Sequence, residues 1–158
     1  MPEASNPPSP AKRDPAVPFE SEAKGTRARA PEDPLIRKWQ ISILQRDRAG
    51  VEFASSAFLA GEDTYRDRLV KLASEDAEPR IRGFTVTLLS RLRKPPPEEV
   101  FVLALGDAAE PPRESAMAAL GKVGTRACLE ALDRAALADP SERLRGVAAE
   151  AARVVRAK

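Results

Sequence analysis

From position 34 onward, apolar residues recur three or four positions apart, the spacing that places them on one face of an α-helix. The first such stretch follows Asp33, a suitable N-cap, and Pro34, which is favoured in the first turn of a helix. Gly50 is expected to end this helix. Its apolar face contains Leu35, Ile36, Trp39, Ile43 and Leu44, and we expect Trp39 to lie in the core.

Further segments with the same spacing follow, separated by prolines and glycines. A run of prolines at 95–97 is expected to stop one of them, because proline lacks an N–H group and disfavours helical backbone in the preceding residue. None of the segments alternates as a strand does. The sequence therefore predicts an all-α fold with about eight short helices, the later ones at residues 51–60, 63–73, 79–93, 98–105, 111–123, 125–137 and 140–157.

The N-terminal segment differs from the rest of the chain. Residues 1–33 are rich in proline and mixed charge, and they hold too little apolar surface to offset the entropy lost on ordering. We predict a disordered tail at 1–33 and a folded domain at 34–158. The tail is either a passive linker or a short binding motif, and the motif's anchor would be Val17-Pro18-Phe19.

The helical part contains a repeat of about 31 residues. RGFTVTLLSRL, RESAMAALGKV and RGVAAEAARVV begin at Arg82, Arg113 and Arg145, and in each the arginine is followed by a small residue three positions later and by apolar residues further on. An aspartate precedes each arginine by six positions: Asp76, Asp107 and Asp139. The segment from Val51 fits loosely, without the aspartate or the arginine.

The helices between these segments also align. Their apolar positions align Leu69 with Val100 and Leu129. This register makes Phe101 equivalent to Val70 and Glu130. Because the three residue types differ, the core of the repeat does not require an apolar residue at this position. The register predicts that the Phe101 ring is exposed.

On these residues the chain resembles the HEAT-repeat family, in the short bacterial form related to phycobilisome-lyase repeats. The match is good at Asp107, Pro111, Arg113, Ala116 and Leu120, whereas Thr85, Leu88 and the KPPP turn at 94–97 depart from it. The resemblance implies a right-handed α-solenoid of about three to four helical hairpins. It also implies that the repeated aspartates and arginines pair between neighbouring repeats as a structural ladder. Their repetition in register argues against a catalytic Asp–Arg pair.

Composition narrows the function classes. The formal net charge is only +2, with acids and bases interspersed, which argues against a dedicated nucleic-acid or membrane-surface protein. No apolar run is long enough to span a bilayer, and the N-terminus lacks the layout of a signal peptide. The single cysteine, Cys128, fits a reducing compartment and is expected in the core. We expect a cytoplasmic protein, and richness in Ala, Arg and Pro suggests a bacterial source.

The chain has no histidine. This excludes the His–Glu iron site of deoxyhypusine hydroxylase-like HEAT proteins and a Cys/His zinc site. Nothing specifies the pigment site of the phycobilin lyases. The alkylpurine DNA glycosylases, which are HEAT-like, remain the alternative, because Trp39, Tyr65, Arg66, Arg68 and Lys71 supply aromatic and basic residues. We expect no catalytic residue, cofactor or metal.

The function expected from these features is that of a non-catalytic adaptor or regulatory subunit, which presents a concave helical surface to another protein. Rigid solenoids suit this role because little entropy is lost on binding. Nucleic-acid binding of the glycosylase type is the competing class. The residues expected on the concave face are Tyr65, Arg66, Lys71, Phe101, Arg126, Glu130 and Arg134, with Phe101 as the main anchor.

Overall fold

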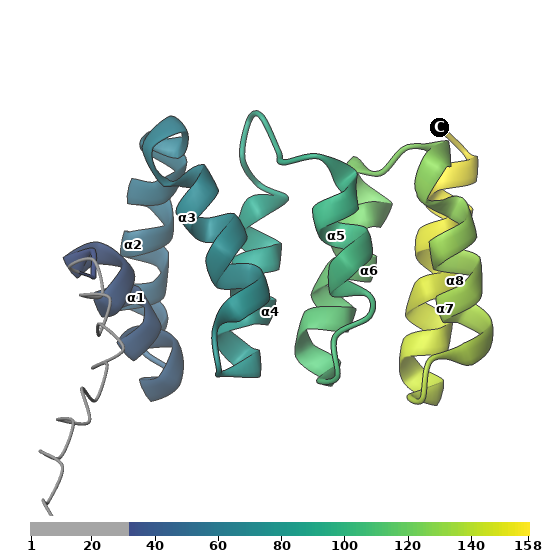
Figure 1. The fold of residues 1–158 in the computed structure, drawn as a ribbon, viewed down its shortest axis with the longest axis horizontal. Coiled ribbons are helices and arrows are strands. Elements are labelled where there is room, and N and C mark those ends of the chain that lie inside the picture. Colours follow the sequence, from purple (N-terminus) through teal and green to yellow (C-terminus); the bar gives the residue numbers. More distant parts are fainter. Residues whose placement is uncertain (1–31) are drawn as a thin grey trace, which may run out of the picture. The chain divides into compact units, whose positions relative to one another are not determined.

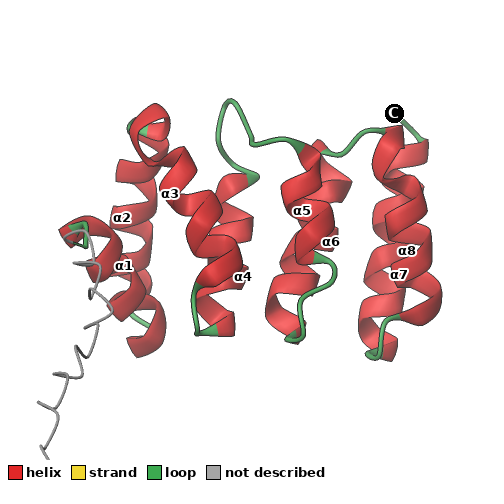
Figure 2. Ribbon diagram, viewed as in Figure 1, coloured by secondary structure: helices red, strands yellow, loops and turns green. Residues whose placement is uncertain are grey.

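The computed structural model describes residues 32–158, which form helices joined by loops and contain no strand (Figure 2). The predictions for the tail, including the motif Val17-Pro18-Phe19, lie outside these described residues. All the predicted helical segments are present, with ends shifted by a few residues. The helices are α1 (Pro34–Gln45), α2 (Arg48–Ala60), α3 (Glu62–Glu75), α4 (Pro79–Leu89), α5 (Glu98–Ala104), α6 (Glu110–Val123), the 3₁₀ turn η1 (Arg126–Cys128), α7 (Leu129–Ala138) and α8 (Glu142–Arg156).

The helices of the unit 32–158 pack in consecutive pairs. Helix α1 packs on α2, α3 on α4, α5 on α6 and α7 on α8, and Figure 1 shows these pairs following one another. Contacts between pairs are made mainly by the second helices, since α4 packs on α6 and α6 on α8. At the N-terminal end α1, rather than α2, contacts α4. The first pair therefore meets the second helix of the next pair mainly through its own first helix.

Helix α1 ends earlier than Gly50, so the predicted break is wrong. Arg46 follows the helix in the left-handed conformation, with φ of 59°, and Asp47 caps α2 by accepting a hydrogen bond from the N–H of Gly50. Gly50 thus lies in the first turn of α2. The aspartate cap and the left-handed residue set the break, and helical spacing alone does not reveal either.

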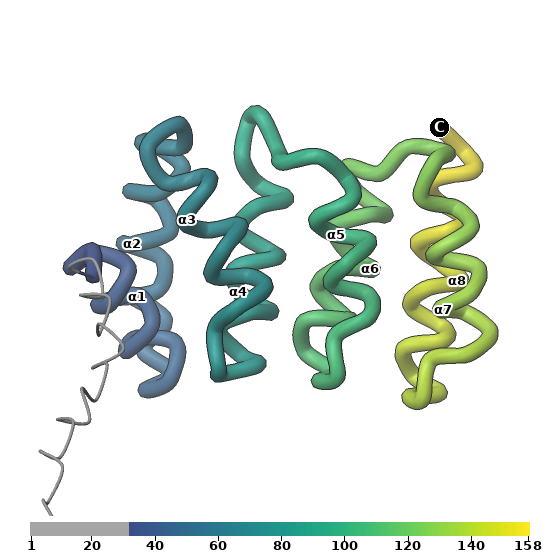
Figure 3. The backbone as a smooth tube through the Cα atoms, viewed as in Figure 1, coloured from purple at the N-terminus to yellow at the C-terminus, as the bar shows by residue number. Residues whose placement is uncertain are grey.

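Helix α4 is shorter than the predicted segment 79–93 and ends at Leu89. The connection at 90–97 arches between α4 and α5 (Figure 3). Two side chains of α3 hold it: Glu62 Oε2 accepts a hydrogen bond from the N–H of Arg93 at 2.8 Å, and Arg66 Nε donates one to the carbonyl of Lys94 at 3.1 Å. These contacts replace the helical turn that the sequence pattern predicts there.

Small residues allow the second helices to approach closely. A Cβ atom on Gly83 of α4 would lie 3.1 Å from the backbone of Pro111 in α6, and one on Gly121 would lie 3.5 Å from Ala151 in α8. Ala116 and Ala119 are buried. Tight packing of this kind explains the small residues spaced along each repeat, because larger side chains would separate the helices.

The buried residues form one core cluster along all the pairs. At its N-terminal end, Trp39 packs edge-on against Phe58, which in turn packs against Tyr65. Trp39 donates its indole N–H to Ser55 Oγ at 3.2 Å, so its polar atom is satisfied. The predicted core positions of Trp39 and Cys128 are confirmed, since both are buried.

The prediction that the Phe101 ring is exposed is wrong. Leu69, Phe101 and Leu132 are all fully buried and are equivalent in the three helices α3, α5 and α7. Helix α5 is one residue shorter before its aspartate: the N–H of Asp107 bonds the carbonyl three residues back, whereas Asp76 and Asp139 bond four back. Phe101 stands six residues before its aspartate, whereas Leu69 and Leu132 stand seven before theirs. Once the missing residue is allowed for, Phe101 takes the core position of Leu69 and Leu132.

Candidate interaction surface

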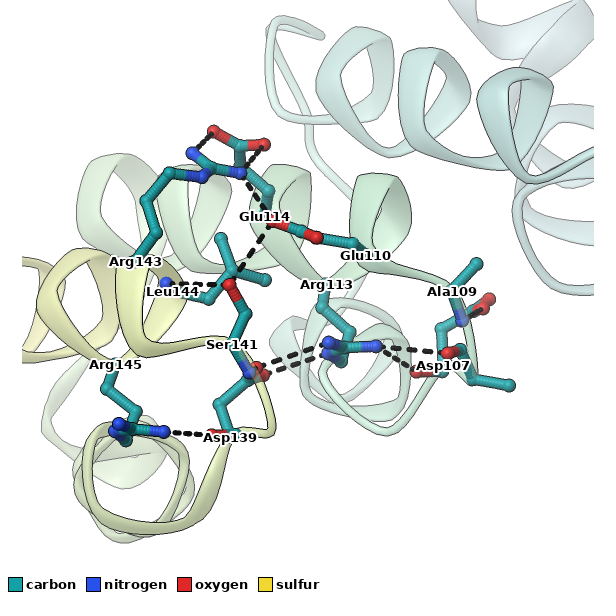
Figure 4. Close-up of polar contacts among 11 residues, drawn as sticks. Asp107, Ala109, Glu110, Arg113, Glu114, Asp139, Ser141, Arg143, Leu144 and Arg145 are labelled. Carbon is teal, nitrogen blue, oxygen red and sulfur yellow. Dashed lines mark hydrogen bonds and ion pairs between the residues drawn. The ribbon is translucent and has the colours of Figure 1, made fainter.

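An arginine–aspartate ladder joins successive helix pairs (Figure 4). Arg82 of α4 donates from Nε and Nη2 to the two carboxylate oxygens of Asp107, both at 2.7 Å. Arg113 of α6 does the same to Asp139, at 2.8 and 3.2 Å. Each arginine thus binds the aspartate of the next repeat in a bidentate pair, the geometry that matches a guanidinium to a carboxylate.

The third nitrogen of each guanidinium binds within its own repeat. Nη1 of Arg82 donates to the carbonyl of Asp76 at 2.7 Å, and Nη1 of Arg113 donates to the carbonyl of Asp107 at 3.1 Å. Arg145 makes the equivalent bond to the carbonyl of Asp139 at 2.9 Å. Arg82 and Arg113 therefore each bind the turn before their own helix and the aspartate of the next repeat.

Each aspartate also caps its own turn. Asp76, Asp107 and Asp139 accept a hydrogen bond at 2.8 Å from the N–H two residues later. The carboxylate of Asp76 differs from the others in its partner: Gln40 Nε2 of α1 donates to it at 2.7 Å. Gln40 thus takes the place of an arginine at the first junction, which the repeat pattern does not reveal.

The ladder shifts the pKa values of its carboxyl groups. Hydrogen bonds from Arg82 hold the pKa of Asp107 below its ordinary value, and those from Arg113 do the same for Asp139, against the opposing effect of burial. The pKa values of the two arginines are raised by the same bonds. All four groups stay charged and mutually satisfied, so they are suited to hold the repeats together rather than to transfer protons.

The exposed side of α3, α5 and α7 presents two sets of equivalent side chains. Two positions before the buried Leu69, Phe101 and Leu132 stand three exposed acids, and two positions after them stand two cations and a leucine. The acids are Asp67, Glu99 and Glu130; the other set is Lys71, Leu103 and Arg134.

Leu103 and Leu137 are the most exposed large apolar residues of 32–158, at 79 % and 84 %. Sequence analysis missed both. Counting back from the aspartates aligns Leu103 with Leu72 and Ala135. Only the residue missing before Asp107 places Leu103 with the exposed Lys71 and Arg134, and the sequence carries no signal for it. Leu137 follows Arg134 by three positions on α7 and is exposed like it.

A cleft of 460 Å³ lies between α5 and α7. Val102, Leu105, Ala131 and Ala135 give it an apolar lining, while the Arg113–Asp139 pair and Arg134 add charge. Leu103 is adjacent in sequence to Val102, and Leu137 to Ala138, which also lines the cleft.

The residues expected on the binding face divide into two groups. Tyr65, Arg66 and Phe101 are used inside the fold: Tyr65 packs on Phe58, Arg66 holds the 90–97 connection, and Phe101 is buried. The others are exposed, and of these Arg134 donates to Glu130 at 2.7 Å. They are Lys71, Arg126, Glu130 and Arg134.

Within the described part of the chain, no helix is long and apolar enough to cross a membrane, and no cluster of His, Cys, Asp or Glu could hold a metal ion. Comparison with protein-family models, with curated proteins and with solved structures gave no match.

Proposed function

We propose that residues 34–158 form a right-handed α-solenoid of HEAT-like repeats and act as a non-catalytic adaptor in the cytoplasm, binding another protein over the exposed side of α3, α5 and α7. Support for the architecture comes from the consecutive helix pairs and from a ladder that recurs with the repeat. Repeats that contact only their neighbours are typical of solenoids.

The observation that carries the binding proposal is the exposure of Leu103 and Leu137, whose neighbours in sequence, Val102 and Ala138, line the cleft between α5 and α7. Covering two leucines would remove apolar surface from water, at about 25 cal/mol for each Å². The charged pair Glu130–Arg134 lies on the same exposed side of α7. An apolar centre with a charged rim is the usual anatomy of a protein interface.

The acidic set Asp67, Glu99 and Glu130 favours a protein over a nucleic acid. A nucleic-acid backbone approaching this side would meet one exposed carboxylate on each of the three helices. Affinity for nucleic acid depends largely on cations that neutralise phosphates. Acids in equivalent positions oppose such contacts, and Leu103 stands where a third cation would otherwise complete the basic set.

The experiment places a photo-crosslinking residue at Leu103 in cells, identifies the crosslinked protein by mass spectrometry, and measures its affinity for the purified chain. We expect Leu103→Glu and Leu137→Glu each to weaken binding by about tenfold or more, because they introduce a charge into a desolvated contact. Circular dichroism should show an unchanged helical fold.

Leu44→Glu is the matched control, since Leu44 is an exposed leucine on α1, away from the cleft. It should leave the affinity unchanged. Equal affinity of all three variants and the parent chain would contradict the proposal.

A further inference from the structure

Within residues 32–158, the last arginine of the ladder, Arg145, has an unfilled carboxylate position. Arg82 and Arg113 each bind a backbone carbonyl of their own repeat and a carboxylate of the next. Arg145 makes the carbonyl bond to Asp139 through Nη1, but its Nε and Nη2 have no acceptor among residues 32–158. Figure 4 shows Arg113 bonded on two sides and Arg145 bonded on one.

The open N–H groups of Arg145 are accessible. No buried side-chain nitrogen or oxygen in the described part of the chain lacks a hydrogen-bond partner, so these groups contact solvent. The bond to the Asp139 carbonyl also fixes the guanidinium in place. A guanidinium held by one nitrogen, with its Nε and Nη2 edge free, is already oriented for a bidentate carboxylate.

We infer that Arg145 is a carboxylate-binding site, which takes an aspartate side chain of a partner protein in the same bidentate geometry as Asp107 and Asp139. The site lies on α8 and is distinct from the surface at Leu103 and Leu137. It does not depend on the proposed binding there.

The bound aspartates within the chain define the expected ligand more closely. Asp107 and Asp139 each accept, besides the arginine, a hydrogen bond from the N–H two residues later. This turn fixes the carboxylate on its own backbone before it meets the guanidinium. We therefore expect a short acidic turn of the form Asp-X-X, in which the third residue supplies the N–H group.

The surface next to Arg145 differs at one position from the surface of α6 on which α8 packs. Arg145 is equivalent to Arg113, 32 residues earlier in the chain. The same spacing makes Arg153 equivalent to Gly121. Gly121 lies against Ala151 of the next helix, whereas Arg153 is exposed and paired with Glu150 at 2.6 Å. A further helix packed as α8 packs on α6 would have to displace this exposed ion pair.

The test uses the full chain and the peptide acetyl-Asp-Pro-Ser-Glu-amide, which copies the turn at 139–142. Arginine Nε–H resonances are followed by NMR during the titration. We expect a saturable shift of the Arg145 resonance with little change at Arg82 and Arg113, whose carboxylate sites are filled. The peptide with Asn in place of Asp should bind about tenfold more weakly, because an amide cannot form the charge-assisted pair.

Arg145→Lys is the matched variant, since lysine keeps the charge but not the planar pair of donors. Backbone amide shifts around Asp139 should then show about tenfold weaker peptide binding. The inference is overturned if the Arg145 resonance shifts no more than that of the exposed Arg126, if the Asn peptide binds equally well, or if Arg145→Lys has no effect on the affinity.

Discussion

Arg113 and Asp139 form a bidentate ion pair across the boundary between α6 and α8, with side chains only 10 % and 3 % exposed. The pair spans 26 residues of sequence and joins two helix pairs through their most buried charges. Removing the Arg113 side chain leaves the buried carboxylate of Asp139 without its main partner. This lowers the free energy of unfolding more than the loss of a surface ion pair does.

Arg113→Ala should lower the free energy of unfolding by about 2 to 4 kcal/mol, because Asp139 keeps only its turn hydrogen bond. Urea denaturation followed by circular dichroism measures this change. Arg145→Ala is the control: it loses one carbonyl bond and leaves no carboxylate unpaired, so a smaller loss is expected. Equal losses in the two variants would show that the ion pair is not the source of the effect.

Lowering the pH should reduce the contribution of the ladder to the free energy of unfolding. The pKa values of Asp107 and Asp139 are lower in the folded chain than their ordinary value, so the ladder's contribution is complete above about pH 4 and is lost as the pH falls through the lower folded values. Unfolding free energies measured from pH 7 down to about pH 2 test this. In Arg113→Ala the drop should be smaller, since the pKa of Asp139 returns toward its unfolded value. Parallel curves for the two proteins would contradict this assignment.

Phe101→Ala should lower the unfolding free energy by about 3 to 5 kcal/mol, because the ring is fully buried and its removal leaves a cavity. Leu103→Ala, two positions away on α5, should change it by less than about 0.5 kcal/mol, since that side chain is largely exposed. Thermal denaturation of both variants distinguishes the observed register from the one that sequence alignment predicts, in which Phe101 would be the tolerant position.

Ala119→Leu should cost about 1 to 3 kcal/mol, because Ala119 is buried in the closely packed α6 and the larger side chain has no free space. The same change at Ala118 should be nearly neutral, since Ala118 is exposed beside a cavity between α6 and α8. Melting temperatures of the two variants provide the comparison. A similar melting temperature for both would show that the facing of α6 is wrong.

The helices and the position of the ladder could be predicted because they depend on local spacing and on repetition. The burial of Phe101 could not be predicted, because the residue missing before Asp107 turns α5 relative to the alignment. The roles of Glu62 and Glu98 could not be predicted either. The carboxylate of Glu62 accepts a hydrogen bond from the N–H of Arg93, 31 residues away, and that of Glu98 accepts one from the N–H of Thr125, 27 residues away. A glutamate at a helix start is common, and its distant backbone partner leaves no pattern in the sequence.

In the ladder, Gln40 gives the first junction a neutral donor and one hydrogen bond, whereas Arg82 and Arg113 give the later junctions a cation and two hydrogen bonds each. The pair Arg68–Asp33 also crosses the first junction, but Arg68 is exposed and such a pair stabilises little. The ladder therefore holds the first helix pair less firmly than it holds the later pairs. The pair α1–α2 is expected to open locally while the three later pairs stay closed, so backbone amides of α1 should exchange with deuterium before those of α6. A chain of this kind unfolds from its N-terminal pair inward, and a Gln40→Arg substitution would bring that pair into the cooperative unit.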